Sequence, residues 1–397
     1  MIEHLRRAFN AAWSPEAYEA YKACLAAESG ASIGFRVCET PVFLPPVLRD
    51  TMVGAAHEIW DLLLQPDRLE RSKAAVPVAF CAPGADDHPL FAQADFAVVR
   101  EADGRLGPRL IELQAFPSLY GFQFLQGRAC RNLALGGDRL DFLLGGLDEP
   151  GYLRVVGEAI LGGIPAENVV LLDLDPPSQG TYPDFTATER LFGVRPVCAT
   201  RVERRGRELW YERDGRATRI LRVYNRLIAD ELLEKKVNLP FRFTDELDVE
   251  WAGHPNWFFR WSKHALPGLD HPLVPESRLV SELERAPEDL ERWVLKPLFS
   301  FSGSGVKVDL TRADLDRVPE AERASTLLMR KVDYAAAVES PEGARSRVEV
   351  RVMFVWHRGR PLPVTTLARL SQGKMMGVKW NRDKRWVGSS SCLWPED

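Results

Sequence analysis

The 397-residue sequence has no long hydrophobic run and no strong excess of charge of either sign. No segment approaches the ~20 consecutive apolar residues that a membrane-spanning helix needs, and residues 1–7 lack the apolar core of a signal peptide. The formal net charge is -4, with lysine and arginine scattered along the chain, so nothing indicates a nucleic-acid surface. We therefore expect a cytoplasmic protein without nucleic-acid or membrane partners; its oligomeric state is left open.

Cysteine is sparse, and two common nucleotide-binding signatures are missing. The six cysteines lie far apart and form no CxxC pair, which argues against a zinc knuckle or a redox dithiol and fits a reducing compartment. The chain contains neither the Walker A pattern nor a GxGxxG turn after a strand, so P-loop and Rossmann dinucleotide sites are disfavoured.

Hydrophobic periodicity predicts a mixed α/β protein in two or three lobes. Helical spacing at 15–27 and 48–64 predicts amphipathic helices. Strands 95–99 and 109–113 are expected to form a hairpin around the turn 102–104, and an Asp-Gly pair predicts a second hairpin. The other expected elements are an α/β unit of strand 169–174, helix 185–192 and strand 194–200; hairpin strands 208–213 and 216–224; strands 76–81, 293–297, 306–310, 327–332, 348–356 and 362–370; and a helix near 276–283.

One chemistry-bearing stretch pairs a lysine with a flexible turn. Lys296 lies at the end of a predicted strand, and the glycine/serine segment 302–305 follows within a few residues. Backbone N–H groups in such a turn can surround phosphate oxygens, while the ammonium offsets their charge. The alternative is an ordinary hairpin turn beside a solvated lysine.

A second stretch collects oxygen donors on the first hairpin. Glu112 and Gln114 point to the same side of their strand, and Asp95 can join them from the paired strand. Carboxylate and amide oxygens suit Mg²⁺, although acidic residues at strand ends are commonly only solvated.

A third stretch alternates charged and apolar residues. Glu349 and Arg351 share one side of a predicted strand, opposite Val350 and Val352, and this pattern suits either a nucleotide site or any half-exposed strand. A basic cluster follows, and its alternative interpretation is a solvated face; it comprises Arg369, Lys374, Lys379, Asn381 and Arg385.

Together these residues resemble the ATP-grasp superfamily, in which two α+β lobes hold ATP between antiparallel sheets. The resemblance implies that Lys263 and Lys296 approach ATP phosphates, and that main-chain groups of an adenine-binding hinge read the base. It assigns the flexible loop to Ser302, Gly303, Ser304 and Gly305, and the hinge to Arg330, Lys331 and Val332.

The same resemblance assigns the remaining site residues. It implies that Glu349 and Asn381 bind the nucleotide, that Arg351, Arg369 and Lys296 act in catalysis, and that Mg²⁺ is held near the amino terminus by Asp95, Glu112 and Gln114. Gln114 stands where the family usually has Asn.

In the usual ATP-grasp order the magnesium motif closes the domain, whereas here it precedes the lysine strand. This order resembles the circularly permuted clan that includes glutathionylspermidine synthetases. The fold expected is α+β and α/β, with a Rossmann-like lobe at 151–240 between permuted ATP-grasp strands at 1–150 and nucleotide-binding lobes at 241–397.

The implied activity is ATP-dependent ligation of a small-molecule or peptide carboxylate to an amine, or to a thiol, through an acyl phosphate. A catalytically inactive nucleotide-binding module and a small-molecule kinase are the alternatives.

Overall fold

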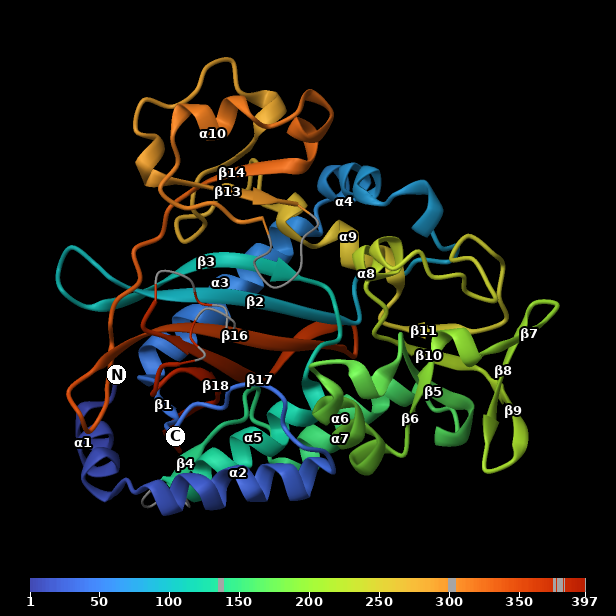
Figure 1. Cartoon of the computed structure of the whole chain (residues 1–397), viewed down its shortest axis with the longest axis horizontal. Coiled ribbons are helices and arrows are strands. Elements are labelled where there is room, and N and C mark those ends of the chain that lie inside the picture. Colours follow the sequence, from blue (N-terminus) through green and yellow to red (C-terminus); the bar gives the residue numbers. More distant parts are fainter. Residues whose placement is uncertain (135–138, 299–304, 374–375, 377–380, 382, 397) are drawn as a thin grey trace.

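Three sheets organise the chain, as the computed structural model shows (Figure 1). The structure describes residues 1–134, 139–298, 305–373, 376, 381 and 383–396. A large antiparallel sheet lies at the centre, a small antiparallel sheet lies above it in Figure 1, and a parallel sheet with its helices lies at the lower right. The expected mixture of α+β and α/β elements is confirmed.

The large sheet joins strands from the two halves of the chain. Its order is β18-β17-β16-β2-β3, all neighbours are antiparallel, and β15 also pairs with β16. The strands are β2 (Phe91–Arg100), β3 (Leu106–Gln114), β15 (Val338–Glu339), β16 (Arg345–His357), β17 (Arg360–Ser371) and β18 (Gly388–Ser390).

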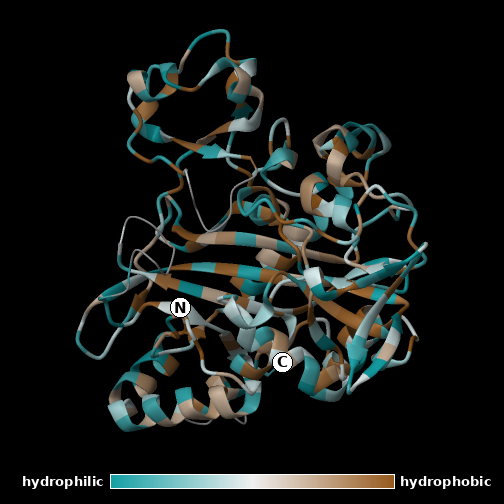
Figure 2. Cartoon of the chain, turned by 45° about the vertical axis from the view of Figure 1, so that its right-hand side comes forward, coloured by the Kyte–Doolittle hydropathy of each residue, from teal (hydrophilic) through white to brown (hydrophobic). Residues whose placement is uncertain are grey.

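Helix α3 (Pro46–Leu63) covers one side of this sheet. Its buried residues, among them Met52, Ile59 and Trp60, pack in one cluster with the apolar residues that alternate along β2 and β16. Each fully buried aliphatic side chain of this kind contributes about 1.5–3 kcal/mol of transfer free energy. Figure 2 shows the result as bands of hydrophobic residues along the central strands, with hydrophilic residues between them. The polar residues of these strands must therefore face the other side.

The parallel sheet has the order β11-β10-β5-β6, and short apolar strands build it. All five residues of β5 are buried, as is typical of a strand covered on both sides. The strands of this sheet are β5 (Val169–Asp173), β6 (Arg195–Cys198), β10 (Arg222–Asn225) and β11 (Glu250–Ala252). Beside the sheet lie two helices, α6 (Glu149–Leu161) and α7 (Tyr182–Phe192). A projecting ribbon adds three strands, β7 (Glu203–Arg205), β8 (Glu208–Arg213) and β9 (Arg216–Ile220).

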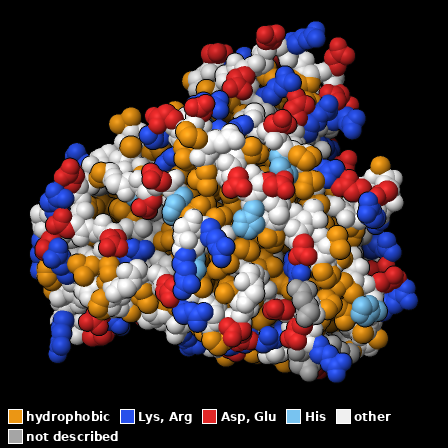
Figure 3. All heavy atoms as spheres, turned by 180° about the vertical axis from the view of Figure 1, so that it is seen from behind, with side chains coloured by type: hydrophobic (Ala, Val, Ile, Leu, Met, Phe, Trp, Pro, Cys, Tyr) orange, Lys and Arg blue, Asp and Glu red, His pale blue; other side chains and the backbone are white. Residues whose placement is uncertain are grey.

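The small sheet has the order β12-β14-β13 and carries its own core. Its outer side packs on short helices, so that Trp293 and Leu295 are buried there. The elements are β12 (Ser277–Leu279), β13 (Trp293–Pro297), β14 (Thr326–Arg330) and α10 (Arg312–Asp316). In Figure 3, which shows the molecule from behind, acidic and basic side chains alternate over this upper lobe.

The remaining elements pack around these sheets. Short strands from both ends of the chain pair in parallel, with Val42 opposite Cys392. In the described residues no helix combines the length and the apolar character of a membrane span. The elements are α1 (Glu3–Ala12), α2 (Pro15–Ser29), α4 (Pro66–Ser72), α5 (Tyr120–Leu133), α8 (Ala229–Glu234), α9 (Pro255–Arg260), β1 (Val42–Phe43), β4 (Leu140–Asp141) and β19 (Cys392–Pro395).

Four of the expected elements are wrong in type or extent. The run 76–81 forms only the 3₁₀ turn Val78–Phe80, since Pro77 offers no N–H and Val78 is 87% exposed. The expected helix near 276–283 contains β12, because pairing with β14 outweighs the helical pattern. Within 306–310 only Lys307 pairs, in a bridge to Leu295, and the strand expected at 216–224 is interrupted at Leu221 between β9 and β10.

Candidate functional site

The side of the large sheet opposite α3 carries a row of polar residues drawn from four strands. Asp95 on β2 lies opposite Glu112 on β3 and opposite Arg351 on β16, while Glu349 on β16 lies opposite Arg369 on β17. Because side chains alternate along a strand, these five project to the same side. We call this row, together with Gln93 and Gln114, the polar face.

Asp95 and Arg351 form a buried, two-pronged ion pair at the centre of the polar face. The Nε and Nη2 groups of Arg351 donate to the two carboxylate oxygens at 2.6 and 2.7 Å, and its Nη1 donates to Gln93 Oε1 at 2.9 Å. Asp95 is fully buried and Arg351 is 6% exposed. Burial alone would raise the pKa of Asp95, but Arg351 and Arg369 outweigh it and hold the pKa below its usual value. Asp95 therefore stays ionised.

Arg369 links two carboxylates. Its Nη2 group donates to both Asp95 and Glu349, and the other Glu349 oxygen accepts from the Tyr334 hydroxyl at 2.8 Å. Burial raises the pKa of Glu349, and Arg369 offsets only part of that effect. The Nε of Arg369 is buried and has no hydrogen-bond partner in the described structure. The guanidinium thus retains a donor that a further oxygen could satisfy.

Two lysines from other elements approach the polar face near Glu112. Lys296 on β13 brings its ammonium to 3.4 Å from the carbonyl of Ile111, next to Glu112, and to 3.3 Å from Met329 Sδ. Lys263 begins the 3₁₀ turn after α9, and its ammonium lies 3.3 Å from Glu112 Oε1. The expectation that the acidic hairpin lies against the lysine strand is confirmed.

The environment of Lys296 fits an anionic ligand. In the described part of the chain no carboxylate forms an ion pair with this ammonium, and burial lowers its pKa, with Glu112 opposing the shift. A largely desolvated cation without a paired anion is costly. Phosphate oxygens between Lys296, Lys263 and the two arginines would supply the missing charge, so these residues fit a nucleotide's phosphates.

The predicted metal ligands are adjacent, but the carboxylates of Asp95 and Glu112 are engaged with cations. Gln114 Nε2 lies 3.3 Å from Glu112 Oε2, while both oxygens of Asp95 accept from arginines. No group of three His, Cys, Asp or Glu residues suited to a metal occurs in the described residues. Mg²⁺ in nucleotide sites commonly takes one or two carboxylates plus substrate phosphates. Glu112 and Gln114 fit that partial role, and Asp95 as a ligand stays a prediction.

The other predicted residues are placed as follows. The amide N–H groups of Arg330 and Lys331 donate to the carbonyls of Glu276 and Arg292, so contact with a base edge would have to come from Val332 or from carbonyl groups. Asn381 is buried, and its amide oxygen accepts from the Ser371 hydroxyl at 3.1 Å. Gly305 is exposed at the end of the predicted loop, while Ser302, Gly303 and Ser304 lie outside the described residues, as do Lys374 and Lys379.

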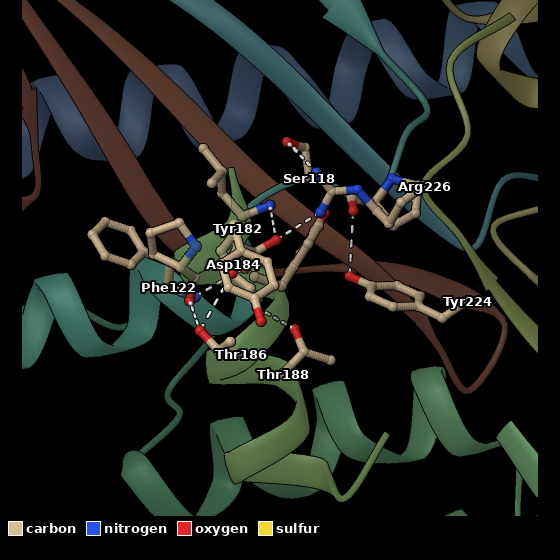
Figure 4. A network of polar contacts seen from close by, with 12 residues as sticks. Ser118, Phe122, Tyr182, Asp184, Thr186, Thr188, Tyr224 and Arg226 are labelled. Atoms are coloured by element: carbon tan, nitrogen blue, oxygen red, sulfur yellow. Dashed lines mark hydrogen bonds and ion pairs between the residues drawn. The ribbon is translucent and has the colours of Figure 1, made fainter. Parts of the chain in front are cut away.

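A buried network fixes the segment that follows β3 (Figure 4). Asp184 on α7 accepts from the amides of Leu119 and Phe122 at 3.1 and 3.0 Å, and its carboxylate pairs with Arg226 at 2.6 Å. Leu119 has a backbone φ of 69°, a value that residues other than glycine rarely adopt. The hydroxyl of Tyr224 adds a bond to Pro117 at 3.3 Å. The network therefore couples the polar face to the parallel sheet.

Sequence reasoning missed several polar residues of the site and of its support. Gln93 could have been found, since it is two residues before Asp95 on the same strand and hence on the same side. Tyr334 lies between two strands, and no pattern in the sequence connects it with Glu349. Asp184 lies one residue before an expected helix and Arg226 follows an expected strand, but their pairing depends on long-range packing.

Comparison with known proteins supports the fold. No protein-family model matches the sequence, and no curated protein matches it either. Among solved structures, the chain is similar to a glutathione synthetase-like effector from Globodera pallida in its apo form. The similarity has a TM-score of 0.56 at 12% sequence identity and covers 97% of this chain and 98% of that chain. Identity this low establishes a shared fold and nothing about activity.

Proposed function

We propose that the chain is an ATP-grasp ligase that uses Mg-ATP to join a carboxylate to an amine or a thiol. The observation that carries this proposal is that Lys263 and Lys296 lie against the Glu112 strand, beside the ion pairs of Asp95, Glu349, Arg351 and Arg369. The similarity over nearly the whole chain to a protein described as glutathione synthetase-like supports it.

The order of the site along the chain supports a circular permutation of this fold. The hairpin β2–β3, with the proposed metal ligands, precedes the Lys296 strand by almost two hundred residues, yet Lys296 lies against the β3 main chain. We also propose a cytoplasmic location, with small-molecule or peptide acids and amines as substrates.

When bound, Mg-ATP would supply the γ-phosphoryl group that activates a substrate carboxylate as an acyl phosphate. The residues of the chain would position the reactants and neutralise the negative charge of the phosphates. Lys263, Lys296, Arg351 and Arg369 place four positive charges at the polar face, and transition-state charge on a phosphoryl group is stabilised chiefly by such fixed cations. Glu112 and Gln114 would hold the metal. No side-chain nucleophile is required, because the amine itself displaces the phosphate.

The arginines have a second task in this proposal. Without a ligand they neutralise Asp95 and Glu349, which are too deeply buried to remain ionised alone. The unpartnered Nε of Arg369 and the donors of both guanidinium groups can then turn partly toward phosphate oxygens without a large movement of the sheet. The polar face is in this sense preorganised.

The test is a mass-spectrometric screen of acid and amine pairs with Mg-ATP, coupled to an assay of ADP release. A condensed product supports the ligase. A phosphorylated product identifies a kinase instead, and nucleotide-dependent stabilisation without turnover over a broad panel identifies a binding module. Lys296→Met should abolish ADP release, whereas Lys307→Met serves as the matched control, because Lys307 is exposed and pairs with Asp314. Equal turnover in both variants would contradict the assigned role of Lys296.

A further inference from the structure

A cavity lies away from the polar face, between α4, α9 and the segment 81–87. It has a volume of about 470 Å³, within the ~300–1,000 Å³ typical of small-molecule sites, and it is partly open to solvent. In Figure 1 helices α4 and α9 lie between the small upper lobe and the parallel sheet. None of its lining residues belongs to the polar face or to the two lysines opposite it.

Arg260 gives this cavity an unsatisfied positive charge. The side chain is 5% exposed and lies over Trp257, with its Cζ 3.8 Å from the ring centroid. Its Nε donates to Ser72 Oγ at 2.9 Å and its Nη2 to the Leu69 carbonyl at 3.2 Å. Within the described part of the chain, Nη1 has no hydrogen-bond partner and no carboxylate pairs with the guanidinium.

Those two hydrogen bonds give Arg260 a structural role, but they leave the Nη1 donors of the guanidinium without an acceptor in the described residues. A guanidinium has five donors in a planar fork that matches a carboxylate. Burial lowers the pKa of Arg260, against the opposing influence of Glu70 and Asp87, as expected of a cation removed from water. An incoming carboxylate on Nη1 would offset that desolvation.

Charges of both signs line the cavity. Asp86 and Asp87 are exposed and form no ion pair in the described residues, whereas Glu70 already pairs with Lys73, another lining residue, at 2.6 Å. Leu69 and Val76 add apolar atoms to the lining. The cavity therefore offers two charged poles, the Arg260 cation and the unpaired aspartates, together with an apolar wall.

The rim is held in place by buried hydrogen bonds. Asn256 on α9 accepts from the amide of Ala82 and donates to its carbonyl, each at 2.9 Å, and His254 lies 3.1 Å from the Pro83 carbonyl. The segment that carries the two aspartates is thus tied to the same helix that carries Arg260. A site whose poles are fixed in this way loses little conformational entropy on binding.

We propose that this cavity binds a free α-amino acid with an apolar side chain, its carboxylate on Arg260 and its ammonium on Asp86 and Asp87. This inference does not depend on the proposed ligase activity, because the cavity shares no residue with the proposed nucleotide site.

Isothermal titration calorimetry of the full chain without nucleotide tests the proposal. The probes are L-alanine, L-valine, L-leucine and L-methionine, followed by 4-methylpentanoate and 3-methylbutylamine, which each retain one charged group of leucine. We expect at least one amino acid to bind, and the single-charge analogues to bind at least tenfold more weakly than leucine. Absence of binding across the four amino acids would overturn the proposal, as would equally tight binding of 4-methylpentanoate.

Three variants locate the site. Arg260→Gln and the double variant Asp86→Asn/Asp87→Asn should each weaken binding at least tenfold, while Arg71→Gln, on α4 but not among the residues that line the cavity, should not. The double variant changes only exposed side chains, so it decides the question even where Arg260→Gln lowers the yield of folded protein. Unchanged affinity in the double variant would place the ligand elsewhere and overturn the assignment.

Discussion

The ion pair between Asp95 and Arg351 makes a strong quantitative prediction about stability. Asp95→Ala removes both bonds from Arg351 and one from Arg369, and it leaves Arg351, only 6% exposed, with Gln93 as its remaining side-chain partner among the described residues. Removing one member of a buried pair costs about 3–5 kcal/mol, since the other charge stays buried without compensation. Arg351→Met should cost less, about 1–3 kcal/mol, because Asp95 keeps its bond from Arg369.

The double variant Asp95→Ala/Arg351→Met should be far less destabilised than the sum of the two single variants. It removes both charges, and Arg369 keeps Glu349 as a partner. We expect a coupling free energy of about 2–3 kcal/mol, near the upper end of the range for residues in direct contact.

Urea denaturation gives the assay, with tryptophan fluorescence and circular dichroism as independent probes of the 11 tryptophans and the backbone. The pair Arg205–Glu203 is the control, because it has the same two-pronged geometry, at 2.9 and 2.8 Å, on exposed strand β7. Glu203→Ala should leave the midpoint unchanged. Strictly additive effects of the two buried substitutions would refute the reasoning, since they would show that neither charge depends on the other.

Three further predictions concern buried polar groups. Burial raises the pKa of Asp173 to about 7, so between about pH 4 and 7 the folded state holds a proton that the unfolded chain releases. Stability should therefore fall as pH rises over that range. Asp173→Asn should raise the unfolding free energy by roughly 2–4 kcal/mol at pH 8, and urea titrations should show a weaker dependence of stability on pH. Tyr334→Phe removes the bond to Glu349 and should lower stability by about 1–3 kcal/mol while weakening Mg-ATP binding in calorimetry; unchanged binding would separate Tyr334 from the site. Asp184→Ala should lower the unfolding free energy by about 3–5 kcal/mol in the same denaturation assay, because Arg226, only 3% exposed, would lose its paired carboxylate. A change under 1 kcal/mol would contradict the structural role of the network in Figure 4.

Local patterns predicted the parts of the fold that depend on neighbouring residues. The hairpin of β2 and β3 follows from the Asp103-Gly104 turn and flanking alternation, and helix α2 follows from its Ser14 cap, Pro15 and apolar spacing. Alternation also placed Glu349 and Arg351 on the same side of β16. These features require no knowledge of distant partners.

Partners far apart in sequence decided the remainder. Ser277–Leu279 is a strand because β14 pairs with it, and Leu221 interrupts a predicted strand because its amide bonds to Asn168. Similarly, Asp95 was predicted from the sequence as a metal ligand, but β16 places Arg351 against both of its oxygens. The register between strands 256 residues apart is a tertiary property that no local window contains.

The large sheet also constrains when the protein can fold during translation. Strands β2 and β3 leave the ribosome long before β16 and β17, and β1 waits longer still for β19 at residues 392–395. Until then, the inner edge of β2 and the acidic side chain at its centre lack the strand that covers them, and such an unpaired edge is prone to pair with other chains. A premature stop codon before β16 would therefore remove the strands that carry Glu349, Arg351 and Arg369, and not simply shorten a tail.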